Sequence, residues 1–214
     1  MSFAPALPPE TKLLESLLWQ PGAGYFLLDR HLERLQRSAQ SLGFPYDAKL
    51  VQGQLQNYAN SLRESRKVRL TLDDQGVIEI NDETVKPSTS VRAALALTPV
   101  SRDELLLRHK TTDRRIYADR LTAIRHPRLD DVLLWNEQEE LTETSSANIV
   151  LKMGDVALTP RESCGLLAGT YRAELLASGE IQESVLPVSA LAQAKSIWLI
   201  NSVRRWCPIE WVRL

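Results

Sequence analysis

The sequence predicts an α/β (α+β) fold in two domains, and three observations point to it. Short apolar runs typical of strands and longer segments with helical spacing occur in both halves of the chain. A length of 214 residues with 43% hydrophobic content allows one large domain or two small ones, which bury roughly 70% of the unfolded surface. Because each half mixes strands with helices, we expect two domains with a cleft between them. The expected division is a smaller N-terminal domain at 1–97, a linker at 98–109 and a C-terminal domain at 110–214.

The chain is expected to begin with two strands. The proline-rich stretch 2–10 is expected to be extended. The apolar run at 13–19 predicts a buried strand, the glycine-containing stretch 21–24 a turn, and 25–28 a returning strand.

Helical spacing of apolar residues predicts two helices next. The first is capped by Asp29 and ends at Gly43, before Pro45. Its inward residues are Leu32, Leu35, Ala39 and Leu42. The second runs from about 48 to 64 with Asp47 as its cap. Its inward residues are Leu50, Leu55, Tyr58 and Leu62.

The remaining segments alternate between strands and helices. A hairpin is expected at 67–80, with its turn at Asp74-Gln75-Gly76, then a strand at 91–97 and a crossover at 98–107. The second half is expected to contain helices at 113–124 and 169–177, a short helix from 189, and strands at 131–135, 147–152, 156–158, 196–200 and 208–212.

Composition excludes several classes of function. The net charge is -1 and the pI about 6.3, so neither nucleic acid nor an anionic membrane is expected as a partner. Cys164 and Cys207 give no disulfide framework, and three scattered histidines add no metal-ligand spacing. We therefore expect no metal and a reduced, cytoplasmic setting. No signal peptide is evident, and no stretch approaches the ~20 apolar residues of a membrane span.

Three polar clusters contain the candidate chemistry. The first centres on Lys110, which follows an apolar run and precedes a helix start. A lysine in such a place is usually solvated. A functional role for Lys110 is therefore indicated only by its combination with the other two clusters, at 141–149 and 200–204.

Residues 142–146 are expected to form a polar loop between two strands, with one carboxylate and four hydroxyl groups. The simpler interpretation is a hairpin with side-chain caps. The alternative is that Glu143 faces a ring nitrogen and holds its proton. A buried carboxylate and a cationic ring lower each other's desolvation cost.

Two further features suit a phosphate group. Residues 165–172 run from a glycine-containing loop into a helix, whose N-terminus offers backbone N–H groups and a partial positive charge. Ser202, at a strand end, can add a hydroxyl. Arg34 shares a helical face with His31 and can bind a phosphate through two hydrogen bonds. A solvated helix face is the competing interpretation of this pair.

A lysine amine, a carboxylate, an arginine and a glycine-led helix start are the groups that pyridoxal 5′-phosphate requires. In this chain the arginine comes first, followed by the lysine, the carboxylate and the glycine-led helix start, and with that order the sequence resembles the class IV aminotransferase family, the fold type IV pyridoxal-phosphate enzymes, from about Leu14 to Pro208. The family includes branched-chain and D-amino-acid aminotransferases and aminodeoxychorismate lyase. The resemblance implies a two-domain enzyme with pyridoxal 5′-phosphate in the interdomain cleft.

The resemblance also assigns roles to single residues. His31-Leu32-Glu33-Arg34 matches the motif whose arginine binds the cofactor phosphate. Lys110 matches the Schiff-base lysine and is the implied catalytic residue. Glu143 matches the glutamate that contacts the pyridine nitrogen. The implied cofactor-binding residues are Arg34, Lys110, Glu143, Gly169, Thr170, Tyr171 and Ser202.

Within the family, segments 108–117 and 200–206 look most like the aminodeoxychorismate lyase module, found alone or fused behind a para-aminobenzoate synthase component. This likeness implies conversion of 4-amino-4-deoxychorismate to 4-aminobenzoate and pyruvate, a step of folate biosynthesis. It also implies a homodimer and a synthase component as functional partner. Arg204 and Arg114 are the candidates for binding the substrate carboxylates. The chain lacks the longer N-terminal segment that lines the substrate side in free-standing transaminases.

Two other functions stay open. A transaminase for D-amino or branched-chain amino acids would use the same residues, with 2-oxoglutarate as its second substrate. A catalytically idle cofactor-binding or scaffold protein is the third alternative, and the intact Lys110 and Glu143 argue against it.

Overall fold

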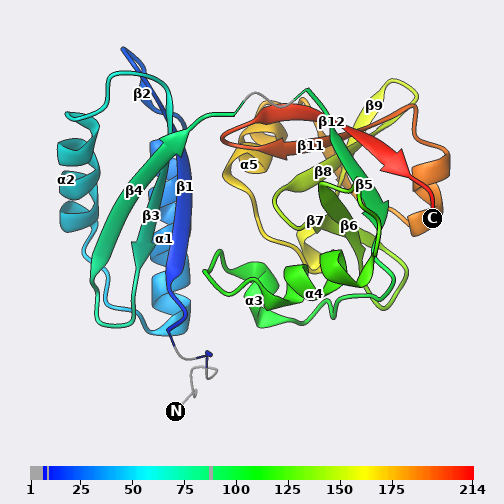
Figure 1. Ribbon diagram of the computed structural model, residues 1–214, viewed down its shortest axis with the longest axis horizontal. Coiled ribbons are helices and arrows are strands. Elements are labelled where there is room, and N and C mark those ends of the chain that lie inside the picture. Colours follow the sequence, from blue (N-terminus) through cyan, green and yellow to red (C-terminus); the bar gives the residue numbers. More distant parts are fainter. Residues whose placement is uncertain (1–6, 9, 87–88) are drawn as a thin grey trace. The chain divides into compact units, whose positions relative to one another are not determined.

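The computed structural model describes residues 7–8, 10–86 and 89–214, and it divides into two compact units (Figure 1). The first unit contains Met1–Lys86 with His109–Asp113, and the second contains Pro87–Arg108 with Arg114–Leu214. Both units combine helices with a sheet, which confirms the predicted α/β class. The stretch expected to be extended at 2–10 lies mostly outside the described residues. None of the helices in the described part of the chain has the length and hydrophobicity that a membrane span requires.

The first unit is a four-stranded antiparallel sheet with two helices. Its strands are β1 (Leu13–Gln20), β2 (Gly24–Tyr25), β3 (Arg66–Leu72) and β4 (Ile78–Thr84), in the order β2-β1-β3-β4. Its helices are α1 (Leu28–Leu42) and α2 (Ala48–Ala59). Helix α1 packs against β1, and α2 packs against β4. The hairpin predicted at 67–80 is confirmed as β3 and β4.

Helix α1 begins differently from the prediction. Leu27 has a left-handed backbone (φ 56°) and precedes the helix, whereas Asp29 lies in the first turn and is not the cap. A carboxylate in the first turn still interacts favourably with the helix dipole. The helix ends as predicted at Gly43, whose φ of 75° is the left-handed conformation that glycine adopts without strain.

Helix α2 has the predicted cap, since Asp47 accepts hydrogen bonds from two backbone N–H groups of the first turn. The helix ends at Ala59, earlier than predicted. Ser61 Oγ donates to the carbonyl of Tyr58 at 2.7 Å and so satisfies an acceptor of the last turn. Leu50, expected to point inward, is 49% exposed.

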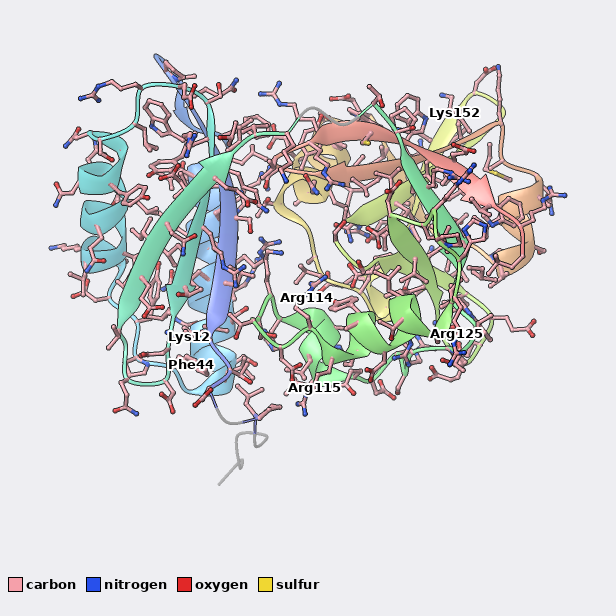
Figure 2. The ribbon with its side chains drawn as sticks, viewed as in Figure 1. Lys12, Phe44, Arg114, Arg115, Arg125 and Lys152 are labelled. Atoms are coloured by element: carbon pink, nitrogen blue, oxygen red, sulfur yellow. The ribbon has the colours of Figure 1, made fainter. Side chains whose placement is uncertain are left out.

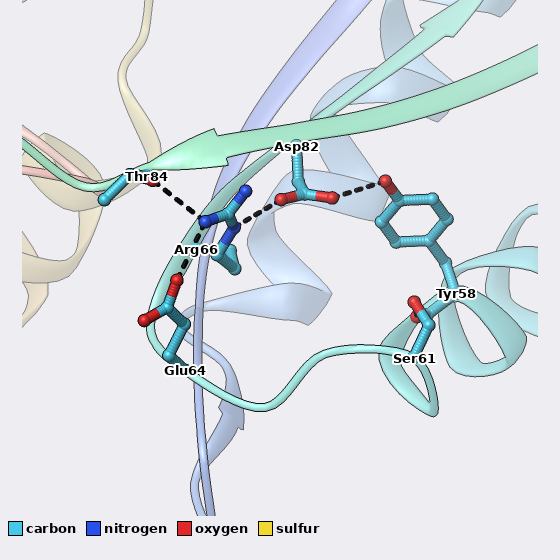
Figure 3. Close-up of polar contacts among 6 residues, drawn as sticks. All are labelled: Tyr58, Ser61, Glu64, Arg66, Asp82 and Thr84. Carbon is cyan, nitrogen blue, oxygen red and sulfur yellow. Dashed lines mark hydrogen bonds and ion pairs between the residues drawn. The ribbon is translucent and has the colours of Figure 1, made fainter.

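A polar network ties α2 to the edge strand β4 (Figure 3). Tyr58 Oη donates to Asp82 Oδ1 at 2.5 Å, and Arg66 Nε donates to Asp82 Oδ2. Arg66 Nη1 also donates to Glu64 and Thr84, at 2.9 Å each. The hydrogen bonds from Tyr58 and Arg66 lower the pKa of Asp82. The network therefore holds α2 against the edge of the sheet.

Residues 109–113 belong to the first unit because their backbone pairs with the start of β1. The carbonyl of Lys110 accepts a hydrogen bond from Leu14 N at 2.9 Å, and Thr112 N donates to the carbonyl of Lys12 at 2.9 Å. Strand β5 (Val91–Leu95) belongs to the second unit because it pairs there with two other strands. The bounds of the units therefore differ from those expected, which ended the N-terminal domain at residue 97 and began the C-terminal domain at residue 110.

The second unit is built on an eight-stranded mixed sheet in the order β10-β9-β8-β11-β12-β5-β6-β7. Besides β5, its strands are β6 (Asp131–Trp135), β7 (Leu141–Thr144), β8 (Asn148–Met153), β9 (Val156–Pro160), β10 (Gln182–Ser184), β11 (Ser196–Asn201) and β12 (Arg205–Val212). An additional pairing of Glu143 with Asn148 joins β7 back to β8. The six strands from β8 to β7 therefore form a closed ring.

The helices of the second unit are α3 (Leu105–Arg108), α4 (Arg115–Ala123) and α5 (Thr170–Ala177), with short 3₁₀ turns η1 (Glu162–Cys164) and η2 (Val188–Ala192). The predicted helices at 113–124 and 169–177 are confirmed as α4 and α5, whereas α3 and β10 were not predicted. Two apolar clusters occupy opposite faces of the strands. One contains Ala93 and Leu133, and the other contains their neighbours Ala94 and Val132.

Candidate functional site

A buried ionic cluster lies between β1 and α1 in the first unit. Glu15 on β1 is 3% exposed. Its Oε1 accepts a hydrogen bond from Arg34 Nε at 2.9 Å, and its Oε2 accepts from Arg34 Nη2 and His31 Nδ1 at 2.6 Å each. His31 and Arg34 share a helical face, as their spacing predicts. That face is buried, so the interpretation of a solvated helix face is wrong.

The pKa values show how this cluster is charged. Burial by itself raises the pKa of Glu15, but the charges of Arg34 and His31 and their hydrogen bonds lower it to about 2. Burial lowers the pKa of His31, and Glu15 offsets that effect only in part. His31 is therefore neutral at pH 7, with the proton of Nδ1 directed at Glu15, because a carboxylate can only accept. The guanidinium and the carboxylate neutralise each other inside the unit.

Lys110 lies close to this cluster. Its positive charge contributes to the lowered pKa of His31, and its backbone is fixed to β1 as described above. The preceding residue, His109, is tied to α1, with 3.0 Å between His109 Nδ1 and Ser38 Oγ. The first unit therefore gathers Arg34 and Lys110, two of the predicted site residues, around one strand and one helix.

Glu143 is a second buried carboxylate, and it lies on β7 rather than on the predicted loop. It is 3% exposed, and β7 pairs with strands on both sides, which accounts for the correction. Its Oε1 accepts a hydrogen bond from Tyr117 Oη at 3.1 Å. Its Oε2 accepts from Leu167 N at 3.3 Å and from Asn148 Nδ2 at 3.5 Å. These three donors are neutral and come from separate parts of the second unit.

Tyr117 connects Glu143 to Arg114, which lies just before α4 (Figure 2). The guanidinium carbon of Arg114 is 4.1 Å from the centroid of the Tyr117 ring, and Nη2 donates to the carbonyl of Ser145. Burial and then the charge of Glu143 raise the pKa of Tyr117 well above its usual value. The phenol therefore stays protonated and donates. Arg114, predicted to bind substrate, also contacts this tyrosine and the turn after β7.

The start of α5 lies close to the same asparagine. A Cβ atom on Gly169 would lie 2.1 Å from Asn148 Oδ1, so a side chain there would require Asn148 to shift. Asn148 Nδ2 donates to the carbonyl of Leu167 at 2.8 Å. Within the described residues, α5 begins at the buried Thr170 without a side-chain cap hydrogen bond. A helix start of this kind presents backbone N–H groups suited to an anion.

Ser202 and Arg204 lie in the turn between β11 and β12. Asn201 Oδ1 accepts hydrogen bonds from Val203 N at 3.1 Å and Arg204 N at 2.8 Å, which closes the turn. This geometry buries Ser202 and exposes Arg204. In the part of the chain that the structure describes, the guanidinium of Arg204 has no hydrogen-bond or ion-pair partner. It is therefore available to an anionic ligand.

The second unit thus contains Glu143, Gly169 and Thr170 in one connected set, with Tyr171 following on α5 and Ser202 in a separate turn. Sequence reasoning did not single out Glu15, Tyr117 or Asn148. Glu15 had a signal, since it is the one carboxylate in the apolar run at 13–19. The roles of Tyr117 and Asn148 depend on tertiary contacts, which no local pattern shows.

Comparison with known proteins identifies a family and similar proteins for this chain. The family model described as Amino-transferase class IV matches residues 12–212. A protein of Schizosaccharomyces pombe, provisionally named an aminodeoxychorismate lyase, is 29% identical over 212 residues. The match covers 92% of this chain and 88% of that protein.

Two solved structures resemble the chain along most of its length. A protein of Mesorhizobium loti, provisionally named an amino-acid aminotransferase, matches with a TM-score of 0.88 and 34% identity, over 95% of this chain and 100% of that one. A protein of Legionella pneumophila, provisionally named a 4-amino-4-deoxychorismate lyase, matches with a TM-score of 0.76 and 22% identity, over 94% of this chain and 82% of that one. At 22% identity the second match shows the fold alone.

Proposed function

The chain belongs to the class IV aminotransferase family, and from that premise we propose that it binds pyridoxal 5′-phosphate and acts as an aminodeoxychorismate lyase. The resemblance inferred from the sequence motifs is confirmed by the family match. The proposed reaction converts 4-amino-4-deoxychorismate to 4-aminobenzoate and pyruvate. It belongs to folate biosynthesis.

The arrangement of Glu143 is the main support for the cofactor. Three donors of the second unit, a phenol, a backbone amide and a side-chain amide, contact this buried carboxylate. A carboxylate of that kind keeps a pyridine nitrogen protonated. The start of α5 at Gly169 and Thr170 suits the phosphate, and the buried hydroxyl of Ser202 can add a donor. The residues present therefore fit pyridoxal 5′-phosphate.

Each predicted residue has a distinct task in this proposal. When bound, the cofactor supplies a sink for the electron pair released at the carbon that bears the substrate amine. Lys110 Nζ would hold the cofactor until the substrate amine replaces it, and the amine so freed would accept the proton from that carbon, which contributes roughly 10²–10⁴-fold to the rate. Arg34 binds phosphate. Arg204 binds a substrate carboxylate, with Arg114 as the second candidate.

The lyase assignment is supported by the Schizosaccharomyces pombe relative and by segments 108–117 and 200–206. The Mesorhizobium loti relative supports the second candidate, an aminotransferase for D-amino or branched-chain amino acids. The two activities differ in their need for a second substrate. A lyase releases 4-aminobenzoate and pyruvate without any keto acid, whereas an aminotransferase requires one.

The test is to incubate purified, cofactor-loaded protein with 4-amino-4-deoxychorismate and no keto acid. We expect 4-aminobenzoate and pyruvate in equal amounts. In parallel, D-alanine or L-leucine with 2-oxoglutarate should yield no glutamate. Glutamate formation without 4-aminobenzoate would replace the lyase with the aminotransferase.

The proposal includes the assembly and setting implied by the family resemblance. These are a homodimer, a cytoplasmic location and an aminodeoxychorismate synthase component as functional partner. Light scattering on the purified protein tests the dimer, which would give twice the mass of the 24.1 kDa chain.

A further inference from the structure

A cavity of about 320 Å³ lies in the second unit, and none of the residues implied to bind the cofactor or the substrate lines it. Its lining consists of Val150, Lys152, Ala157, Glu180, Trp198 and Trp206. Ile149 and Leu151, the neighbours of Val150 on β8, belong to the core cluster on the other face of the sheet. Because strand residues alternate between faces, Val150 and Lys152 face the cavity while their neighbours face the core.

Two tryptophans form the aromatic part of the cavity. The rings of Trp198 and Trp206 are arranged edge to face, with 5.9 Å between centroids and 87° between planes. Trp198 Nε1 donates to Ser196 Oγ at 3.0 Å, and Trp206 forms a hydrogen bond with the side chain of Tyr171 on α5. These bonds engage the polar edge of each indole. The surface that the two rings offer to a ligand is therefore aromatic carbon.

The cavity also contains one cation and one anion. Lys152 lies on β8 (Figure 2), and its Nζ donates to the carbonyl of Asp155 at 2.5 Å. An ammonium group has three donors, so further bonds remain available. Glu180 Oε1 accepts a hydrogen bond from Ser178 Oγ at 3.0 Å. Neither partner is charged, so among the described residues neither side chain is neutralised by an ion pair.

We propose that this cavity is a second binding site, for a small planar aromatic carboxylate. A volume of about 320 Å³ is at the lower end for ligand pockets and suits one ring. The tryptophans contact the ring, and Lys152 binds the carboxylate. Glu180 accepts a hydrogen bond from an amine or hydroxyl on the ring and repels a second carboxylate. The proposal goes beyond the proposed function and does not depend on it.

Calorimetric titration of the purified full-length protein tests this site with five probes. Benzoate and 4-aminobenzoate should bind with one ligand per chain. Cyclohexanecarboxylate keeps the charge but lacks the aromatic ring, and benzyl alcohol keeps the ring but lacks the charge. Each should bind at least about tenfold more weakly than benzoate, since each loses one of the two contacts. Terephthalate should also bind more weakly, because Glu180 repels its second carboxylate.

Variants distinguish this cavity from other anion sites. Lys152→Met keeps most of the apolar stem and should weaken benzoate binding about tenfold or more. The matched control is Lys195→Met, because Lys195 is exposed and neighbours β8 but does not line the cavity. Lys110→Ala should leave benzoate binding unchanged, which separates the cavity from the candidate active site. Trp198→Leu should weaken benzoate more than it weakens cyclohexanecarboxylate.

Three results would overturn the proposal. One is the absence of benzoate binding to the wild-type protein. Another is equal affinity of wild type and Lys152→Met for benzoate. The third is tighter binding of terephthalate than of benzoate, which would indicate a general anion patch.

Discussion

Glu15 in the first unit and Glu143 in the second are carboxylates buried to the same extent, at 3% exposure each. Their hydrogen-bond donors differ. Glu15 is bound through both oxygens by the guanidinium of Arg34, with His31 adding a third bond. Glu143 accepts from a phenol, a backbone amide and a side-chain amide. The guanidinium of Arg34 neutralises the charge of Glu15, whereas the three donors named for Glu143 are neutral groups.

This difference separates a structural role from a functional one. A carboxylate paired with a guanidinium holds two elements together, here β1 and α1. A carboxylate held by neutral donors stays negative and can stabilise a cation such as a protonated ring nitrogen. Burial alone therefore does not identify the functional carboxylate, whereas the chemistry of its hydrogen-bond donors does.

The largest effect is expected from Lys110, which lies near His31 in the first unit but belongs to the proposed chemistry. Lys110→Ala should lower turnover by roughly 10²–10⁴-fold, since the group that moves the proton is lost. Borohydride reduction of the cofactor-loaded protein should label Lys110, as read from a peptide map. Lys67→Ala is the control and should retain both turnover and labelling. Label on Lys67 in the wild-type protein would refute the assignment.

The comparison itself is tested by matched substitutions of the two carboxylates. Glu15→Gln leaves the buried Arg34 without its counter-charge, which should lower the free energy of unfolding by about 3–5 kcal/mol. Glu143→Gln disturbs the hydrogen bonds from Tyr117, Leu167 and Asn148 and should cost about 1–3 kcal/mol. Urea unfolding measures both values. An equal cost for the two variants would show that their donors do not distinguish them.

The sequence predicted the elements of both units better than the contacts between elements. Caps and breakers are local, so the end of α1 at Gly43 and the cap of α2 at Asp47 were predicted correctly. Strand pairing is not local. The polar run at 142–146 was assigned to a loop, because only its pairing with β6 and β8 makes Leu141–Thr144 a strand.

The same limit applies to the candidate site. Residue types and motif order pointed to Lys110, Arg34 and Glu143 as a set, but not to the groups that hold them. That Arg34 pairs with Glu15 depends on the packing of α1 on β1, which brings together residues 19 positions apart. That a side chain at Gly169 would require Asn148 to shift depends on the meeting of β8 and α5.

The free energy of unfolding in acid is expected to depend on Glu15, the buried carboxylate of the first unit. The pKa of Glu15 is about 2, against 4.5 for its unperturbed value. As the pH falls below about 4.5 the unfolded chain takes up this proton first, so stability is present above that pH and lost toward pH 2. The loss amounts to about 3 kcal/mol. Because the pKa of His31 is lowered from its usual value of 6.5, this residue also contributes stability that is lost as the pH falls below 6.5.

Urea unfolding between pH 7 and pH 3 measures this dependence. Glu15→Gln should flatten the curve below pH 4.5, because the variant has no proton to take up at that position. A curve for Glu15→Gln as steep as that of the wild-type protein would assign the acid sensitivity to other groups.

The smallest effect is the sharpest test of the second unit's carboxylate. Tyr117→Phe removes the hydroxyl that donates to Glu143 and keeps the ring that Arg114 contacts. One lost hydrogen bond to a charged acceptor costs about 1.5 kcal/mol or somewhat more, or roughly tenfold in an equilibrium. If that bond orients Glu143 toward a cofactor nitrogen, Tyr117→Phe should weaken cofactor affinity by about this factor in a fluorescence titration.

The matched control is Tyr25→Phe in the first unit, which also loses one phenol hydrogen bond, from Tyr25 Oη to the carbonyl of Leu55 at 2.9 Å. Tyr25→Phe should lower the free energy of unfolding but leave cofactor affinity unchanged. Equal losses of cofactor affinity in the two variants would show that Tyr117 contributes only through packing.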